Sequence, residues 1–334
     1  MLALRGWRLL AVVLAGGALA AGLGCSAPPP AEEGGPRHFT LGYIPGAQDF
    51  VIFVMEEQGL LTKHGLAPEK VRVLNPPSVH LMIAEGRVNI GFGGFTTMAT
   101  ARAQGRDVIV FNGVFSPANM VFVPQDSPLQ SISDLRGRKL GNFGGPGSTT
   151  TAFLAVIAAQ WYGMDLFREV KLVTAPGPAL SHLLDRGEID AALLGTMESI
   201  KFFAQGKYRV LADLSAEYKQ RQGRAPAHVT MSTSEQFASE HPDILQDFVR
   251  ASQEAVEFAK ADAGVWARYG ETLGMTSDQE FATLREKMVP NLIDRWDQQQ
   301  IAVQQEYLQF VQSVLGERQM GPIPEGLIRS DFNP

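Results

Sequence analysis

The chain has 334 residues, 45% hydrophobic and 19% charged, a composition typical of globular proteins with a sizeable core. Its formal net charge of −6, its pI of 5.6 and the lack of a basic block disfavour nucleic acid as a partner. An anionic ligand is still compatible with this charge, because a site can be locally positive. Cys25 is the single cysteine, so stability must come from core packing rather than disulfides.

Residues 1–24 have the pattern of a signal peptide. Arg5 and Arg8 precede an uncharged run of small and aliphatic residues, 9–24, that is too short to span a bilayer comfortably. The run ends in Gly-Leu-Gly-Cys, which is similar to a bacterial lipoprotein cleavage site with the lipid on Cys25, although Gly22 stands where Leu is usual. Ordinary secretion with cleavage nearby is the alternative, and both interpretations predict an exported protein. Residues 25–37, rich in proline, glycine and charge, are then a lipidated tether at a membrane.

An internal repeat organises the rest of the chain. Residues 79–110 resemble residues 180–211 at an offset of 101, the distance from Gly86 to Gly187. The identical pairs include Gly86 with Gly187, Gly94 with Gly195, Gln104 with Gln205 and Gly105 with Gly206. Each copy reads as helix, glycine turn, strand, loop, helix and strand, which predicts two similar α/β lobes with mostly parallel sheets. Chance similarity between two generic βα units is the alternative.

The boundaries of the lobes follow from the breaks in this pattern. We expect the first link at 120–131, where Pro124 and Pro128 interrupt an extended segment, and a second crossing within 219–231. Lobe 1 is then 38–123 with 217–334, and lobe 2 is 124–216. Apolar periodicity predicts helices over 242–261 and 297–315, which we expect to pack on lobe 1 and to span its back.

The stretch LGNFGGPGSTTTAF, residues 140–153, reads as a strand, a glycine-rich loop and a helix start. It is not a P-loop, because Ser148 rather than Lys follows Gly147, and a G-x-G-x-x-G motif would need glycine at Thr150. A helix N-terminus with several hydroxyls remains, which can hold a small anion or a polar head group. The alternative is that Ser148 only caps the helix.

Loops after the strands predicted at 39–44, 88–92 and 108–112 offer amides, hydroxyls and aromatic rings, as small-molecule sites do. For Phe53 and Phe92 we favour core packing, whereas for Phe50 and Phe95, at strand ends, we favour ligand contact. The expected ligand-binding residues are Gln48, Asp49, Phe50, Gly94, Phe95, Thr96, Phe115, Asn119, Gly147, Ser148, Thr149, Thr150, Thr196 and Glu198.

The sequence lacks the usual catalytic patterns. Its six histidines show no metal-ligand spacing, no G-x-S-x-G occurs, and the mature domain has no cysteine nucleophile. We therefore predict no catalytic residue, no metal and no cofactor.

The motif SISDLRGRKLGNFGGPGSTT resembles a signature of the periplasmic substrate-binding proteins of ABC importers, in the branch that binds sulfonates and taurine, nitrate or thiamine pyrimidines. The stretches GYIPGAQDF, EEQGLLTKHGL, LMIAEGRVNIGFGG and SEQFASEHPDILQDFVRA extend the resemblance over residues 38–320. It implies an α/β, type II periplasmic-binding-protein fold: two lobes joined by two crossover strands. It also implies a non-enzymatic monomer that closes on a solute and delivers it to the permease subunits.

The resemblance assigns Gln48, Gly94, Thr96, Ser148, Thr149 and Thr196 to the cleft. Ser148 to Thr150 would receive the anionic or polar end, while Gln48, Phe50 and Phe95 would hold the body of the ligand. Since the expected loops contain no Arg or Lys, a flat pyrimidine or other aromatic solute remains a contender beside a sulfonate. A ligand sensor is another alternative, as is an enzyme like the fungal pyrimidine synthase of this family, which uses a cysteine-rich motif, a reactive histidine and a lysine-bound cofactor.

Overall fold

The computed structural model describes residues 35–46, 49–73, 76–143, 145–146, 148–316 and 320–333. The signal segment and Cys25 lie outside these residues, as do most of the tether, Gln48 and Gly147. In the described part of the chain, no helix combines the length and apolarity needed to cross a membrane.

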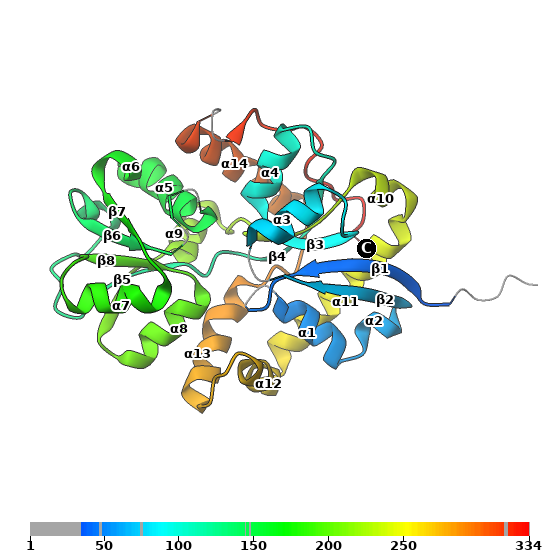
Figure 1. Ribbon diagram of the computed structural model, residues 1–334, viewed down its shortest axis with the longest axis horizontal. Coiled ribbons are helices and arrows are strands. Elements are labelled where there is room, and N and C mark those ends of the chain that lie inside the picture. Colours follow the sequence, from blue (N-terminus) through cyan, green and yellow to red (C-terminus); the bar gives the residue numbers. More distant parts are fainter. Residues whose placement is uncertain are drawn as a thin grey trace, which may run out of the picture. The chain divides into compact units, whose positions relative to one another are not determined.

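Sheet 1 has five strands in the order β2-β1-β3-β10-β4 and belongs to lobe 1, drawn mainly in blue and cyan in Figure 1. Its strands are β1 (Arg37–Tyr43), β2 (Leu66–Arg72), β3 (Ile90–Gly94), β4 (Ile109–Phe115) and β10 (Val229–Thr233). β1 pairs in parallel with β2 and β3, whereas β10 is antiparallel to both β3 and β4. One strand therefore opposes the direction of the other four.

Sheet 2, in lobe 2, repeats this plan with the order β7-β6-β8-β5-β9. Its strands are β5 (Met120–Pro124), β6 (Lys139–Asn142), β7 (Lys171–Thr174), β8 (Ala191–Leu194) and β9 (Tyr208–Asp213). β6 is parallel to β7 and β8, and β5 is antiparallel to β8 and β9. In both sheets the opposed strand follows a crossing between the lobes, so the predicted pair of mostly parallel sheets with two crossover strands is confirmed.

The first crossing lies earlier in the chain than the sequence analysis places it. Residues 120–123 are expected in lobe 1, but β5 pairs with two strands of sheet 2, so the passage from β4 to β5 occupies residues 116–119. Pro124 misleads here because it ends a strand that is already part of the second sheet. The second crossing runs through residues 223–228, between α9 (Leu214–Gln222) and β10, within the predicted range.

The internal repeat is visible in the elements. α3 (Pro76–Ala84) and α7 (Gly177–Asp185), β3 and β8, and α4 (Phe95–Ala103) and α8 (Thr196–Gln205) each begin 101 residues apart. Gly86 and Gly187, which end the first helix of each copy, both have a φ of 65°. This left-handed conformation favours glycine, which explains why both copies carry it there.

The remaining helices pack around the two sheets. They are α1 (Phe50–Glu57), α2 (Leu60–Lys63), α5 (Thr149–Tyr162), α6 (Leu166–Glu169), α10 (Glu235–Glu240), α11 (Pro242–Ala261), α12 (Gly264–Thr272), α13 (Asp278–Met288) and α14 (Gln298–Leu315), with short 3₁₀ turns η2 (Ile132–Leu135) and η3 (Val289–Asn291). As expected, α11 packs on lobe 1, against α1 and α2.

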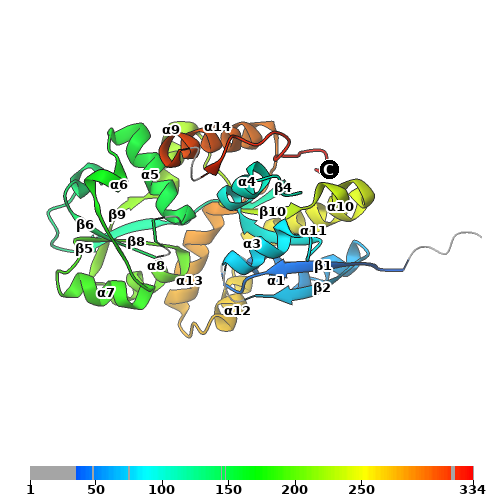
Figure 2. The ribbon, with the colours of Figure 1, turned by 45° about the horizontal axis from the view of Figure 1, so that its top comes forward.

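Helix α14 differs from the expectation, because it contacts α5 of lobe 2 as well as α4 of lobe 1 (Figures 1 and 2). Its Tyr307 ring lies 6.4 Å from the ring of Phe95 and 5.6 Å from that of Phe153. Phe95 begins α4 and Phe153 lies in α5, so an aromatic contact chain connects the lobes through α14.

Candidate functional site

The glycine-rich loop forms the N-terminus of α5, as the sequence predicts. Ser148 is the N-cap: its hydroxyl accepts from the backbone N–H of Thr151 at 3.2 Å and donates to the carbonyl of Gly145 at 2.9 Å. The buried Thr151 hydroxyl donates to the same carbonyl at 2.8 Å. Ser148 and Thr151 thus fix the turn, so the capping role is confirmed, while Thr149 and Thr150 lie at a cavity beside it.

The N-terminus of α4, in lobe 1, faces this loop. Thr96 in its first turn shares a hydrogen bond of 3.1 Å with the hydroxyl of Thr149 in lobe 2. The first N–H groups of each helix have no partner within the helix, and the helix dipole makes both ends locally positive. Two positive helix ends, one from each lobe, therefore meet at one place, which favours an anionic group there.

A cavity of about 730 Å³ adjoins these helix ends. In lobe 1 it runs along α3 and α4, and in lobe 2 it is bounded by Phe143 and residues 148–150. Its lining joins hydroxyls to apolar surface and comprises His80, Leu81, Ala84, Gly94, Thr97, Met98, Thr100, Ala101, Gln104, Arg106, Phe143, Ser148, Thr149, Thr150, His228 and Val229. We call it the solute cavity.

Two histidines of the solute cavity are neutral. Burial lowers the pKa of His80 to about 4, and burial together with the neighbouring His80 lowers the pKa of His228 to about 4. The backbone N–H of Gly94 donates to Nε2 of His80 at 2.9 Å, so the neutral ring carries its proton on Nδ1. Sequence reasoning missed both residues, since it tested histidines only for metal-ligand spacing and His80 and His228 lie far apart in the chain.

Arg106 adds a positive charge that the sequence analysis also missed. It follows the C-terminal end of α4 and lines the solute cavity. Within the described residues it forms no ion pair, so its charge is available to the cavity. The expected loops contain no Arg or Lys, but the cavity beside them has one cation, Arg106, in its described lining.

Two aromatic residues predicted to touch the ligand lie in the core instead. Phe50 is 1% exposed and stacks on Trp266 with ring centroids 4.1 Å apart. Phe95 is fully buried against Tyr307. Each ring belongs to the first residue of a helix, and it packs among the buried residues of a hydrophobic core. The buried Phe92 confirms the expectation of core packing at that position.

Asp49 is engaged in holding its own loop. Its carboxylate accepts from the backbone N–H of Gly46 at 3.1 Å and from the hydroxyl of Tyr269 in α12. Burial raises its pKa, because the two hydrogen bonds only partly offset desolvation. Asp49 is absent from the lining of the solute cavity.

The last expected residues gather elsewhere, at the N-terminus of α8. A Cβ on Gly195 would lie 3.2 Å from Oε2 of Glu198 and 3.9 Å from Oδ1 of Asn119, and Thr196 follows Gly195 directly. The Asn119 amide nitrogen is buried and has no hydrogen-bond partner among the described residues. Phe115 is buried in the core of lobe 1. None of these four lines the solute cavity.

The described residues contain no group of three or more His, Cys, Asp or Glu side chains placed to hold a metal ion. The described lining of the solute cavity contains neither lysine nor cysteine. The site as described offers hydroxyls, helix N-termini, neutral imidazoles and one guanidinium.

Comparison with known proteins gives a family for the chain. The profile of the "NMT1/THI5 like" family matches residues 48–263. A taurine-binding periplasmic protein of Escherichia coli K12 is 24% identical over 216 residues, which is 65% of this chain and 64% of that protein. The match thus spans just under two thirds of that relative.

Solved structures share the fold. The alkanesulfonate-binding protein of Xanthomonas axonopodis pv. citri bound to MOPS has a TM-score of 0.69 at 18% identity, covering 89% of this chain and 99% of that one. The aliphatic sulphonate-binding protein of Escherichia coli has a TM-score of 0.70 at 20% identity, covering 86% and 90%. DszB in complex with biphenyl-2-sulfinic acid has a TM-score of 0.63 at 18% identity, covering 89% and 97%.

The order of the strands, the crossings between the lobes and these comparisons agree with the resemblance in the sequence: the chain belongs to the NMT1/THI5-like family and has the two-lobed fold of the periplasmic substrate-binding proteins of ABC importers.

Proposed function

We propose that the protein is the exported solute-binding component of an ABC importer, and that it captures a sulfonate-type organic anion in the solute cavity. One observation carries the proposal: the N-termini of α4 and α5, from different lobes, meet at the cavity and are joined by Thr96 and Thr149. The names of the taurine-binding relative and of the sulfonate-binding fold relatives support the same class of ligand.

The chemistry of the lining favours a sulfonate. Its three oxygens can accept from the hydroxyls of Thr149 and Thr150 and from first-turn N–H groups, in the field of two helix dipoles. The Nδ1–H of His80 is a further donor. Because the ring is already neutral at pH 7, it can donate this hydrogen bond without first taking up a proton.

The size and apolar part of the cavity favour a body larger than that of taurine. Leu81, Ala101 and Phe143 offer apolar surface along a cavity of about 730 Å³, which is in the range of sites for drug-sized ligands. We therefore infer that an alkyl or aryl sulfonate binds more tightly than a short zwitterionic one.

Capture works through closure of the lobes. A ligand that touches α4 in lobe 1 and α5 in lobe 2 stabilises the arrangement in which both are in reach, in proportion to its differential affinity for that arrangement. We infer that the permease subunits receive the closed form. A lipid on Cys25 would keep the protein at a membrane, in the periplasm or on the outer face of the cell; continued membrane retention of Cys25→Ala would overturn this part.

A flat aromatic solute is the second candidate, and Phe143 favours it. Its ring is 44% exposed and lines the cavity, so it can stack on a planar ligand in place of the buried Phe50 and Phe95. An enzyme with a lysine-bound cofactor is less well supported, because the described lining provides no lysine.

The test is a thermal-shift and calorimetric comparison of octanesulfonate, MOPS, taurine, nitrate and a thiamine pyrimidine. We expect the first two to raise the melting temperature most, since a ligand of the native state stabilises it by mass action. Thr149→Trp should abolish this shift by filling the cavity beside α5, and Thr62→Trp, at an exposed position of α2, should leave it intact. Unchanged binding in Thr149→Trp would remove the solute cavity from the function.

A further inference from the structure

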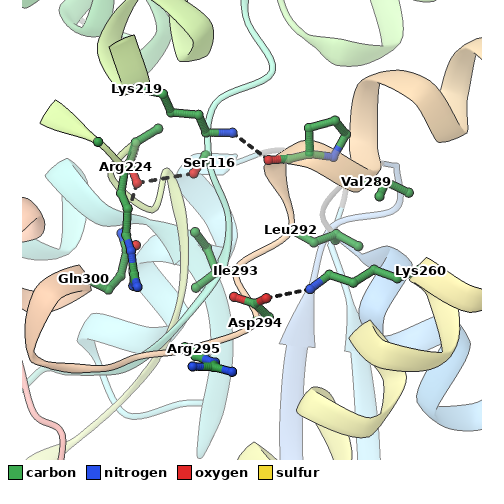
Figure 3. Close-up of a pocket in the computed structure, with 13 residues that line it drawn as sticks. Ser116, Lys219, Arg224, Lys260, Val289, Leu292, Ile293, Asp294, Arg295 and Gln300 are labelled. Atoms are coloured by element: carbon green, nitrogen blue, oxygen red, sulfur yellow. Dashed lines mark hydrogen bonds and ion pairs between the residues drawn. The ribbon is translucent and has the colours of Figure 1, made fainter. Parts of the chain in front are cut away.

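A second cavity, of about 400 Å³, lies where the chain passes between the lobes (Figure 3). Its walls include Ser116 from the first crossing, residues 223–225 from the second, and residues 289–290 and 292–295 from the passage between α13 and α14. The hydroxyl of Ser116 donates to the carbonyl of Ala225 at 3.4 Å, and its N–H donates to the carbonyl of Asn291 at 2.7 Å. The three passages are thus bonded to one another. We call this space the hinge cavity.

The hinge cavity is strongly cationic. Lys219, Arg224, Lys260 and Arg295 line it, against one lining carboxylate, Asp294. This local excess of positive charge stands in a chain whose formal net charge is −6. Lys260 pairs with Asp294 at 2.6 Å, and Arg224 pairs with the neighbouring Asp297 at 2.8 Å. Two of the four cations therefore have a carboxylate partner.

The other two cations have none. The ammonium of Lys219 donates to the carbonyl of Pro290 at 2.5 Å, a bond drawn in Figure 3. It also donates to Oδ1 of Asn291 at 3.1 Å, and both acceptors are neutral. Burial lowers the pKa of Lys219, and the charge of Asp213 offsets only part of this effect. Arg295 forms no ion pair within the described residues. Its charge lowers the pKa of Asp294 and of Asp297 without a direct contact to either carboxylate. A partly buried ammonium and an exposed guanidinium beside one cavity are the donors that an oxyanion requires.

We propose that the hinge cavity binds a small oxyanion, namely phosphate, sulfate or the phosphate or sulfate group of a metabolite. This site is distinct from the solute cavity, because the two linings have no residue in common. The anion lies among Lys219, Lys260 and Arg295, where four cations and one carboxylate line the cavity.

The position of the site couples it to the movement of the lobes. Lys219 belongs to α9, which packs on α5 and β9 of lobe 2, whereas Lys260 belongs to α11 of lobe 1. An anion between them holds together groups from both lobes in the arrangement in which Thr96 and Thr149 also touch. By linkage, an anion bound here raises the affinity for a ligand that needs this arrangement.

The probe is inorganic phosphate, titrated into the full mature protein by calorimetry at constant ionic strength, with sodium chloride as the screening control. We expect saturable binding that weakens about tenfold in Arg295→Gln and in Lys219→Met, because each variant removes one charged donor. Arg168→Gln, which changes an arginine with an 86% exposed side chain in lobe 2, should bind phosphate like the wild type. Arg295 is itself exposed, so its variant is expected to fold even if Lys219→Met does not.

Three results would overturn the proposal: no saturable phosphate binding, binding unchanged in Arg295→Gln, or an equal effect of sodium chloride. Thr149→Trp separates the two sites, because it should lose the sulfonate and keep phosphate. Competition between MOPS and phosphate would show that the hinge cavity is not a separate site. Sulfate in place of phosphate then distinguishes a general oxyanion site from one selective for phosphate.

Discussion

The two lobes have the same plan but contribute unequally to the solute cavity. Lobe 1 supplies two helices, α3 and α4, and both neutral histidines, whereas lobe 2 supplies Phe143 and residues 148–150. At the repeat offset, the position of His80 is occupied in lobe 2 by Ser181, whose hydroxyl bonds to its own helix at 3.0 Å. The duplication thus preserves the scaffold, while side chains at matching positions have diverged in what they can bind.

What the repeat preserves is the close approach of the turn after α3 or α7 to a strand. A Cβ on Gly42 in β1 would lie 3.1 Å from a methyl of Val88, and one on Gly141 in β6 would lie 2.5 Å from Ile189. Val88 and Ile189 are again separated by the repeat offset of 101. Glycine in β1 and in β6 therefore lets the equivalent segment approach, which explains why the sheets could stay alike while the loops changed.

The largest expected effect is on stability and concerns His80, a cavity histidine of lobe 1 that has no histidine at the matching position of lobe 2. With a folded pKa of about 4 against an ordinary 6.5, the unfolded chain binds the proton of His80 more readily than the native state does. The stabilisation is complete above about pH 6.5 and is lost as the pH falls through 4, an effect on the order of 3 kcal/mol. Urea unfolding at pH 7 and pH 4.5 should show a smaller pH dependence in His80→Gln. The exposed His38→Gln variant should keep the dependence of the wild type, and equal slopes in all three proteins would contradict the assignment.

A smaller effect should separate the lobes at the strand beneath α3. A Cβ on Gly91 would lie 2.3 Å from Cγ1 of Ile83, whereas the matching position in lobe 2 already carries Ala192. We expect Gly91→Ala to lower the free energy of unfolding by about 2 kcal/mol through overpacking. The reciprocal Ala192→Gly should cost about 1 kcal/mol, by backbone entropy and a lost methyl contact. Urea denaturation measures both, and a neutral Gly91→Ala would show that Ile83 can move aside freely.

The smallest effect should be the same in both lobes. A Cβ at Gly86 or at Gly187 would meet no atom within 4 Å, so Gly→Ala there costs only the left-handed backbone conformation. We expect about 1 kcal/mol for each variant and additive effects in the double variant. Clearly unequal losses in denaturation experiments would show that the two turns differ in their surroundings despite the shared φ of 65°.

The sequence was sufficient for the repeat, the loop before α5 and the class of fold, because all three depend on local patterns. It was not sufficient for features that depend on contacts distant in the chain. His80 and His228 meet only when β10 pairs beside β3, and Phe50 is buried only because Trp266 of α12 lies against it. Likewise, the apolar face of α14 predicts that the helix packs against the protein. Its sequence does not show that its partners are both α4 of lobe 1 and α5 of lobe 2.

The place of β10 has a consequence for how the chain can be built and divided. All five strands of sheet 2 follow one another within residues 120–213. Sheet 1 is complete only once residues 229–233 are present, because β10 lies between β3 and β4. Lobe 2 is in effect an insertion inside lobe 1, so a fragment ending before residue 229 carries every strand of one sheet and an unfilled slot in the other. Sheet 2 is also the sheet that an emerging chain can complete first.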